Sequence, residues 1–358
     1  MTDVLHVRGV VLPEGIERDL YVVDGRITFS PAASAVTVAD RGWIVPGLVD
    51  AHCHIGLDAQ GAVSPEKQVE QAELTRDTGT LLVRDAGSAA DTRWLDGRLD
   101  LPRIVRAGRH IARPRRYIRN YAVEVEPVDL VAAVAEQAVR GDGWVKLVGD
   151  WIDRDRGDLA PLWPGDVLSE AITRAHSLGA RVTAHVFGTE AMPDLVAAGI
   201  DCLEHGVGLT PDLIDAMAAR GTALVPTRLQ VGRFPEYAAR GEERFPAYAK
   251  HMLTLHARSD AMLAAAYEAG VPIYAGTDAG GELPHGLIAA EIQAMAALMS
   301  PFDALAAGSW RAREWLGLNP MLSEGAPADF VVYETDPLTD LRVLSAPSRL
   351  VLRGAVIR

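Results

Sequence analysis

Residues 44–54 read IVPGLVDAHCH, an apolar run that ends in two histidines separated by one residue. The run favours a buried strand, and side chains two positions apart on a strand point to the same side. His52 and His54 can therefore reach one metal ion together, whereas Cys53 points the other way. Because a His-X-His pattern on a strand is often incidental, a metal site here requires further ligands elsewhere in the chain.

Four further candidate ligands lie at or near the ends of similar apolar runs. They are Lys146 in WVKLV (144–148), His185 in VTAHV (182–186), His205 after Leu203 and Glu204, and Asp278 in YAGTD (274–278). Lys146 is unusual because the chain has only three lysines among its 35 basic residues. A buried cation is costly. A lysine kept inside a strand by a chain that prefers arginine indicates chemistry that needs a primary amine.

The middle of the chain alternates strand-like and helix-like segments. Apolar runs favour eight strands, near 44–54, 80–86, 103–108, 144–149, 181–187, 201–205, 222–227 and 272–278. Helical patterns separate most of them, as in 65–78, 127–140, 164–178 and 211–220. Eight β/α repeats predict an α/β fold, a closed (β/α)8 TIM barrel over residues 46–321. Active sites of such barrels lie at the C-terminal ends of the strands, which would bring the six candidate ligands together.

Both ends of the chain have the pattern of short alternating strands. Asp24 and Gly25 separate two strand-like runs and predict a hairpin turn. Strand patterns return at 329–333 and 349–357. We therefore expect residues 1–45 and 322–358 to form one small β-sandwich domain.

Composition limits the classes of partner. The formal net charge of −13 over 358 residues argues against binding to nucleic acid or anionic membranes, which require a basic surface. Two cysteines imply no disulfide framework. The N-terminus has no signal-peptide pattern, and no apolar run reaches the roughly 18 residues of a membrane span. We expect a cytoplasmic protein that acts on a small molecule, with no nucleic-acid or membrane partner.

Several of these segments together resemble the amidohydrolase superfamily. The matching motifs are PGLVDAHCH (46–54), LEHG (203–206), GTDAG (276–280) and GAPADFVV (325–332). Lys146 on the fourth strand and PHG at 284–286 make the chain most similar to the binuclear Xaa-Pro dipeptidase and N-acyl-amino-acid hydrolase branch. The resemblance covers essentially the whole chain.

The resemblance implies two divalent metal ions, expected to be zinc, bridged by a hydroxide and by Lys146 as its N6-carboxylated form. His52, His54 and Asp278 would hold the more buried ion, and His185 and His205 the more exposed one. The hydroxide would attack an amide carbonyl, with Asp278 as general base and then general acid. The implied reaction is hydrolysis of the amide C–N bond of a dipeptide or N-acyl amino acid. The superfamily also implies a homo-oligomer.

Residues 109–120, RHIARPRRYIRN, form an arginine cluster after the third strand of an otherwise acidic protein. Barrel geometry predicts that this loop lies on the active-site face, and guanidinium groups bind carboxylates well. We expect a carboxylate-bearing substrate. The candidate substrate-binding residues are Arg115, Arg116, Tyr117, Arg119, Arg228 and His285. A solvated loop or a subunit contact is the alternative for the cluster, and a helix cap is the alternative for His285.

Two other functions stay open at this point. If Lys146 is an ordinary lysine at the barrel mouth, the site holds one metal ion and fits a mononuclear deaminase or cyclic-amide hydrolase. A catalytically silent barrel that serves as a binding or scaffold subunit is an alternative of another class. The number of bound metal ions and the released product separate these possibilities.

Overall fold

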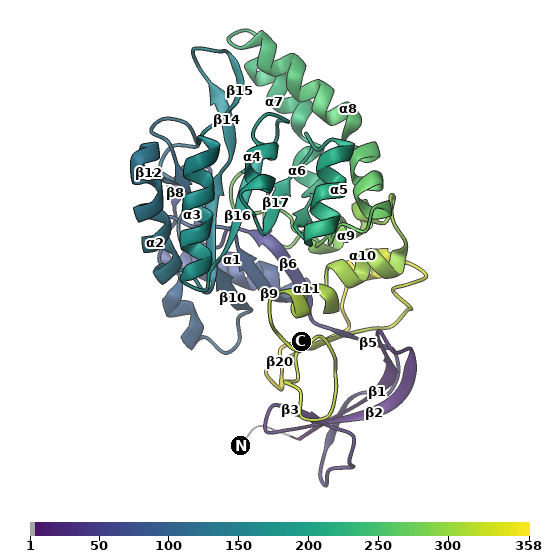
Figure 1. The fold of residues 1–358 in the computed structure, drawn as a ribbon. Helices are drawn as coiled ribbons and strands as arrows, with labels where there is room; N and C mark the ends of the chain where they lie inside the picture. The colour runs from purple at the N-terminus through teal and green to yellow at the C-terminus, as the bar shows by residue number, and fades with distance from the viewer. Residues whose placement is uncertain (1–3) are drawn as a thin grey trace.

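A computed structural model describes residues 4–358 of the chain (Figure 1). The larger part contains parallel strands with helices around them, and the smaller part is built from β-strands. Residues 1–3, which the predicted terminal domain included, lie outside the described residues.

Strands from both ends of the chain form one sheet in the smaller part. Its order is β21-β20-β19-β5-β1-β2-β3, and β4 pairs with β1. The strands are β1 Leu5–Val11, β2 Ile16–Val23, β3 Arg26–Thr28, β4 Val36–Ala39, β5 Trp43–Pro46, β19 Phe330–Tyr333, β20 Arg349–Leu352 and β21 Ala355–Val356. Alternate residues of β1 are buried, as expected for a strand with one face in a core. The sheet therefore joins the two chain ends that the sequence patterns paired.

Two turns define the strand ends in this sheet. The predicted hairpin is present, with Asp24 and Gly25 at φ values of 49° and 75° between β2 and β3. The single strand predicted over 349–357 is instead two antiparallel strands, β20 and β21. Arg353 and Gly354 form the turn between them, with φ values of 49° and 79°. An Arg-Gly pair is a weaker turn signal than Asp-Gly, which explains the difference.

The larger part contains a series of parallel strands, all largely buried except β10, in which three of the four residues are partly exposed. They are β6 Leu48–Cys53, β9 Thr80–Asp85, β10 Arg103–Arg106, β11 Ile111–Ala112, β13 Trp144–Val148, β16 Arg181–Val186, β17 Cys202–His205 and β18 Ala223–Val225. One sheet has the order β10-β9-β6, and another contains β11-β13-β16-β17-β18. Every residue of β6, β9 and β13 is buried. Continuous apolar strands of this kind are typical of parallel sheets covered on both faces.

The segment predicted as the eighth strand, 272–278, is not a regular strand. It forms isolated contacts instead: on one side Tyr274 N donates to Leu224 O at 3.0 Å, and on the other Ala51 N donates to Ala275 O at 2.8 Å. The segment therefore lies between β18 and β6. Gly276 explains part of the irregularity, because a Cβ there would lie 2.6 Å from the Cβ of His52.

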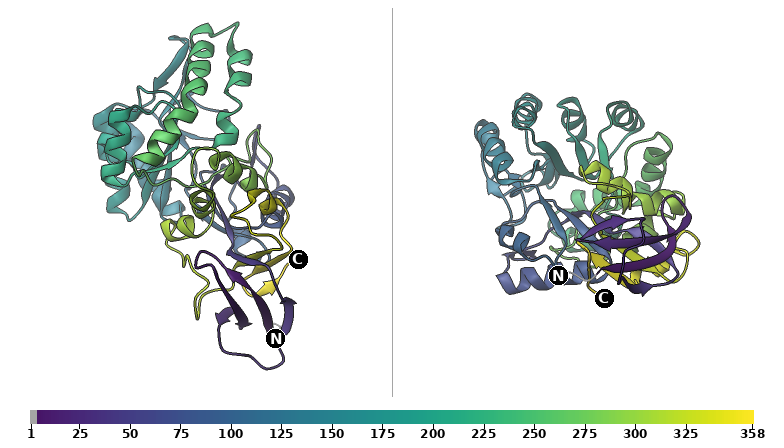
Figure 2. Two further views of the ribbon diagram at one scale, coloured as in Figure 1. Left: turned by 90° about the vertical axis from the view of Figure 1, so that its right-hand side faces the viewer. Right: turned by 90° about the horizontal axis from the view of Figure 1, so that it is seen from below.

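Helices follow most of the parallel strands and surround them (Figure 2). Four match the predicted helical patterns: α1 Pro65–Asp77, α2 Leu130–Arg140, α3 Gly165–Ser177 and α5 Pro211–Arg220. The others are α4 Met192–Ala197, α6 Arg228–Val231, α7 Phe234–Gly241, α8 Pro246–Glu268, α9 Ile288–Met295, α10 Pro301–Ala307 and α11 Trp310–Trp315. A 3-10 turn, Pro127–Asp129, precedes α2 where one continuous helix was predicted.

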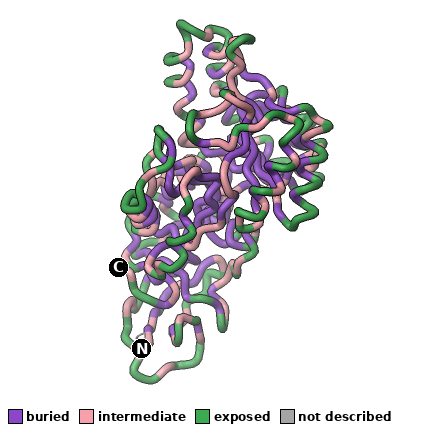
Figure 3. The backbone as a smooth tube through the Cα atoms, turned by 90° about the vertical axis from the view of Figure 1, so that its left-hand side faces the viewer, coloured by how far each residue is buried: buried purple, intermediate pink, exposed green. Residues whose placement is uncertain are grey.

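One hairpin projects beyond the ends of the parallel strands, near α7 and α8 (Figure 1). It is formed by β14 Asp150–Asp153 and β15 Asp158–Pro161. Two short pairs complete the strands: β7 Leu57–Asp58 with β8 Gly61–Ala62, and β12 Val123–Glu124 beside β11. Buried residues concentrate along the parallel strands, whereas exposed residues dominate the outer loops (Figure 3). Among residues 4–358, we find no helix with the length and apolar character that a membrane crossing requires.

Candidate metal centre and substrate cavity

The end of β6 brings two histidines to one carboxylate. His52 Nε2 lies 2.9 Å from Asp278 Oδ1, and His54 Nε2 lies 3.0 Å from the same oxygen. Cys53 lies between them in sequence and is buried in a separate apolar cluster. Asp278 reaches this position because its backbone N–H donates to His52 O at 2.8 Å. These three residues therefore form one compact group.

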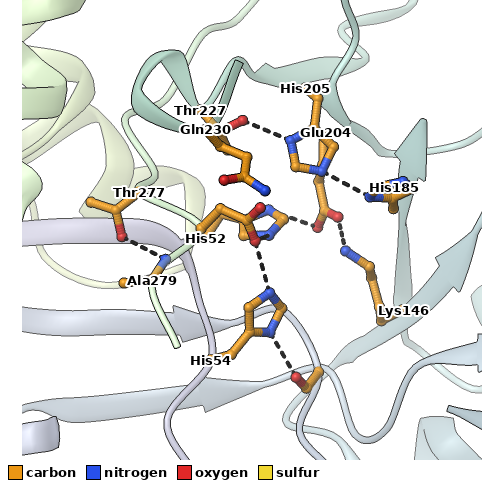
Figure 4. Close-up of polar contacts among 12 residues, drawn as sticks. His52, His54, Lys146, His185, Glu204, His205, Thr227, Gln230, Thr277 and Ala279 are labelled. Atoms are coloured by element: carbon orange, nitrogen blue, oxygen red, sulfur yellow. Dashed lines mark hydrogen bonds and ion pairs between the residues drawn. The ribbon is translucent and has the colours of Figure 1, made fainter. Parts of the chain in front are cut away.

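A second group forms where β16 and β17 end. His205 Nε2 lies 2.9 Å from His185 Nδ1, and the ring centres of His205 and His52 are 5.4 Å apart. One ligand atom each from His52, His205 and Asp278 lies within 4.8 Å of the others. The histidines point toward one another between the strand ends (Figure 4). His205 thus contacts His185 and also lies close to His52 and Asp278, so the division of the candidate ligands between two ions stays a prediction.

Lys146 enters the same space from β13 and contacts a residue that the sequence analysis did not select. Its Nζ forms an ion pair with Glu204 Oε2, and both side chains are buried (Figure 4). Glu204 Oε1 also accepts from Thr183 Oγ1 at 2.7 Å and from Arg84 Nη2 at 3.3 Å. The only signal for Glu204 was its position beside His205 in LEHG, because its contacts depend on the pairing of separate strands.

Burial sets the protonation of these groups. Loss of hydration lowers the pKa of His52 to about 4, with Lys146 and Arg84 acting in the same direction and Asp278 opposing them. Burial also holds the pKa values of His185 and His205 well below the ordinary histidine value. For Asp278, burial opposes ionisation, but the surrounding imidazoles outweigh it and keep its pKa well below the ordinary value. Neutral imidazoles beside a carboxylate are the form in which these residues bind metal.

The residues present fit divalent metal ions. His185 Nε2 is buried without a hydrogen-bond partner among the described residues. His52 Nδ1 also lacks one, although Glu204 Oε1 lies 3.4 Å away. Imidazole nitrogen and carboxylate oxygen are suitable ligands for zinc and related divalent metals. Five such side chains at the ends of three strands and one adjacent segment give more ligands than one ion needs.

Hydrogen bonds from neighbouring loops orient two of the histidines. His54 Nδ1 lies 2.7 Å from Gly87 O, and His205 Nδ1 lies 2.7 Å from Thr227 Oγ1. Such contacts fix which ring nitrogen faces a metal. Thr227 has φ 43° and immediately precedes α6. The backbone N–H of Arg228 donates to the buried Glu291 at 2.6 Å, so Glu291 holds the loop that carries Thr227.

A cavity of about 460 Å³ opens from this centre. Its lining includes the candidate ligands His54, His185 and Asp278. Most of the wall is aromatic or cationic, formed by Tyr117, Tyr121, Trp151, Phe187, Tyr237, Phe245, Tyr248, Arg240 and Arg244. Glu282 also lines it and forms a bidentate pair with Arg240, both distances being 2.9 Å. Much of this wall comes from α7, the start of α8 and the residues between them.

The predicted substrate-binding residues are placed less uniformly than the metal ligands. Tyr117 lines the cavity, whereas Arg115, Arg116, Arg119, Arg228 and His285 are not part of its lining. Arg116 donates to Asp153 at 2.7 Å and to the carbonyl oxygens of Trp151 and Ala160, so it holds the β14–β15 hairpin.

The remaining predicted residues have other surroundings. Arg228 pairs with Asp260. His285 Nδ1 lies 3.2 Å from Thr75 Oγ1. Arg115 and Arg119 are exposed. Roles for these residues in substrate binding therefore stay predictions.

One buried histidine had no partner pattern in the sequence. His110 is fully buried, and neither of its ring nitrogens has a hydrogen-bond partner among the described residues. Its ring centre lies 5.1 Å from that of His54 and 5.3 Å from that of Tyr117. The imidazole thus lies beside the ligand group. The arginine-rich surroundings of His110 in the sequence gave no indication of this position.

The sequence is similar to known proteins over most of its length. Residues 43–356 match the sequence pattern of the Amidohydrolase family. A protein of Mycobacterium tuberculosis (strain ATCC 25618 / H37Rv) that carries the name "uncharacterized" is 57% identical over 353 residues, which cover 98% of this chain and 95% of that one. Ochratoxinase from Aspergillus niger is 30% identical over 227 residues, covering 60% of this chain and 45% of ochratoxinase.

Solved structures resemble the fold over nearly its whole length. A Xaa-Pro dipeptidase with bound methionine in its active site aligns with a TM-score of 0.83 at 22% identity and covers 99% of both chains. Ochratoxinase from A. niger aligns with a TM-score of 0.80 at 21% identity, covering 99% of this chain and 95% of the other. At these identities the likeness concerns the fold alone.

Proposed function

The chain belongs to the amidohydrolase family, and from that premise we propose that it is a metal-dependent hydrolase that cleaves the amide C–N bond of a small molecule. One observation carries the proposal. Six side chains from distant parts of the sequence, five of them buried and Asp278 15% exposed, meet at the inner end of a cavity. They are His52, His54, Lys146, His185, His205 and Asp278.

The metal ligands are assigned from the contact groups. His52, His54 and Asp278 would hold one divalent ion, and His185 and His205 would hold a second, with zinc the expected metal. Bound metal supplies a Lewis acid for the amide carbonyl and lowers the pKa of water to roughly 7. Asp278 takes the proton of the attacking water and passes it to the leaving nitrogen, acting as base and then acid.

Lys146 is proposed to bridge the two ions as its N6-carboxylated form. Burial, the largest cause, lowers the pKa of Lys146 to about 7, so a substantial share of the amine is neutral near neutral pH. A neutral amine adds carbon dioxide and releases one proton, which gives an anionic carbamate. An anion at this position would offset the charge of two cations, whereas an ammonium group would repel them.

A site with one metal ion is the second candidate. The ion pair between Lys146 and Glu204 favours it, because a lysine that stays an ammonium group contributes no ligand. One ion held by His52, His54, His205 and Asp278 would fit a deaminase or cyclic-amide hydrolase. Metal stoichiometry distinguishes this candidate from the first.

The name of one protein of similar fold, a Xaa-Pro dipeptidase, is consistent with an amide substrate. We propose a dipeptide or an N-acyl amino acid as the substrate class. We also propose that residues 46–321 form a (β/α)8 barrel and that 1–45 with 322–358 form a small β-sandwich. A cytoplasmic location and a homo-oligomer remain further proposals from the sequence.

The direct test is a screen of the purified chain, loaded with zinc, against N-acyl amino acids and dipeptides. We expect release of a free amino acid, loss of activity in chelator, and recovery on adding zinc. His54→Ala should abolish activity, while His256→Ala, which lies outside the site, should not. Release of ammonia instead would favour the deaminase. No reaction and no bound metal would contradict both candidates.

A further inference from the structure

The charged side chains that line the cavity favour some amide substrates over others. Two arginines, Arg240 and Arg244, and two carboxylates, Asp278 and Glu282, line the cavity. Both carboxylates already have partners. Asp278 contacts His52 and His54, and Glu282 contacts Arg240 and Arg233, the latter at 3.0 Å. The cavity thus offers no carboxylate that is free to bind a cation.

The two arginines differ in what they can bind. Arg240 is held by the bidentate contact with Glu282, which occupies the outer edge of its guanidinium group. Arg244 lies four residues further on, and no carboxylate among residues 4–358 lies within ion-pair distance of it. Its guanidinium carbon lies 5.0 Å from the ring centre of Phe245. Stacking of this kind holds the plane of the group and leaves its N–H donors available.

We propose that the substrate is an N-acylated amino acid whose carboxylate is bound by Arg244, and that the cavity discriminates against dipeptides with a free amino terminus. The inference rests on the proposed amide hydrolysis and decides between its two substrate classes. A carboxylate gains two charge-assisted hydrogen bonds from a guanidinium fork. With the carboxylate at Arg244, the ammonium group of a dipeptide would lie on the acyl side, among aromatic rings and beside Asp278, which already contacts His52 and His54. It would lose its hydration there without gaining a free partner of opposite charge.

The remainder of the wall supports an acyl group rather than a charged terminus. The aromatic rings at the inner end lie close together, with ring centres of Tyr117 and Trp151 4.8 Å apart and those of His185 and Phe187 4.4 Å apart. An uncharged, apolar acyl group removes this surface from water at about 25 cal/mol per Å² of apolar area. The wall can therefore bind a carboxylate at Arg244 and an apolar acyl group near the metal centre.

The test compares matched compounds on the zinc-loaded enzyme. N-acetyl and alanyl derivatives of phenylalanine, leucine and proline share the leaving amino acid and differ in the ammonium group. We expect kcat/KM to be at least about tenfold higher for the N-acetyl member of each pair, since an unpaired buried charge costs more than one hydrogen bond. N-acetylphenylalaninol lacks the carboxylate, and its KM should be about ten to a hundred times higher than that of N-acetylphenylalanine.

Variants then locate the carboxylate. Arg244→Ala should raise KM for N-acetylphenylalanine by the same factor and leave KM for the alcohol unchanged, with Arg244→Lys intermediate because it keeps charge but loses the fork. Arg8→Ala, on the terminal sheet, is the control. An equal effect of Arg244→Ala on acid and alcohol would overturn the assignment. So would an effect of this size from Arg115→Ala or Arg119→Ala, or a preference for the alanyl compounds.

A binding experiment separates failure of the proposed hydrolysis from failure of the Arg244 assignment. If no compound is hydrolysed, calorimetric binding of N-acetylphenylalanine to the wild type and to Arg244→Ala still tests the inference. Affinity that falls about tenfold or more in the variant supports Arg244 as the carboxylate ligand. Equal affinity in the two proteins, or no binding to the wild type, contradicts it.

Discussion

The floor of the cavity and its outer wall are built in different ways. On the floor, the candidate histidines and Lys146 are buried and Asp278 is 15% exposed. Contacts such as those of His54 with Gly87 and His205 with Thr227 hold these side chains. The outer wall carries Arg240 and Arg244 on and beyond α7, where Arg240 is 54% exposed and paired with Glu282. Charges interact strongly in the buried floor and weakly in the solvated wall.

We therefore expect the floor to determine the reaction rate and the wall to determine the affinity for substrate. A change on the floor leaves a buried group without its partner, so it should affect metal binding and the reaction rate together. A change on the wall is compensated by water and should affect mainly the affinity for substrate.

Asp278→Asn should have the largest effect. It keeps the size of the side chain but removes the proposed proton acceptor, so kcat should fall by about 10²–10⁴-fold. Steady-state kinetics on zinc-loaded protein with a measured metal content provide the check. An Asp278→Asn enzyme that retains both its metal and a tenth or more of the wild-type kcat would show that another group moves the proton.

Lys146→Met should change the number of bound metal ions. The variant cannot form a carbamate bridge, so zinc should fall from two equivalents to one or none. In the metal-free protein, where Lys146 pairs with buried Glu204 as an ammonium group, the substitution should also lower the free energy of unfolding by about 3–5 kcal/mol, the usual cost of breaking a buried ion pair.

Lys67→Met is the matched control, because Lys67 pairs with Glu70 at an exposed position. Elemental analysis and denaturant unfolding report the two effects separately. Two equivalents of zinc in the Lys146→Met protein would rule out the bridging role.

Thr227→Val tests the orientation of His205. Valine preserves the shape of threonine but removes the hydroxyl that contacts His205 Nδ1 at 2.7 Å. Zinc affinity should fall by about 10–100-fold, the usual effect of losing a contact behind a metal ligand. Competition with a fluorescent chelator measures this affinity, and Thr173→Val on the exposed face of α3 is the control. Unchanged affinity would mean that strand geometry alone positions the ring.

Glu282→Gln tests the wall and should have the smallest effect on the fold. Its pairs with Arg240 and Arg233 are partly exposed, so the free energy of unfolding should change by less than about 1 kcal/mol. KM for a carboxylate substrate should fall several-fold, because Arg240 becomes available as a second donor. Denaturant unfolding and kinetics on one preparation measure both quantities. A large loss of stability would place Glu282 in the framework and remove the contrast between floor and wall.

The floor could be predicted from the sequence because each ligand follows a locally recognisable strand. His52 lies near the end of β6 and His54 directly follows it, His185 lies near the end of β16, and His205 ends β17, so the fold itself brings them together. Asp278 was found in the same way, even though its segment is not a regular strand. Alternating contacts with β18 and β6 hold that segment where a strand was predicted.

Apart from Tyr117, the residues of the wall were not predicted, because long connections bring them together. Arg244 and Tyr248 follow a stretch whose path depends on how α7 packs against α8, and no local pattern defines this path. In the arginine cluster, Arg116 contacts Asp153 and is not part of the cavity lining, so its role in substrate binding stays a prediction. Glu204 and His110 were missed because their surroundings arise only from strand pairing.

The most direct test of the account is a crystal structure of the zinc-loaded protein with anomalous data collected at the zinc edge. The account predicts two anomalous peaks, one between His52, His54 and Asp278 and the other between His185 and His205, joined by density extending from Lys146. Absence of zinc from this space at full loading, or zinc bound only to other residues, would contradict it.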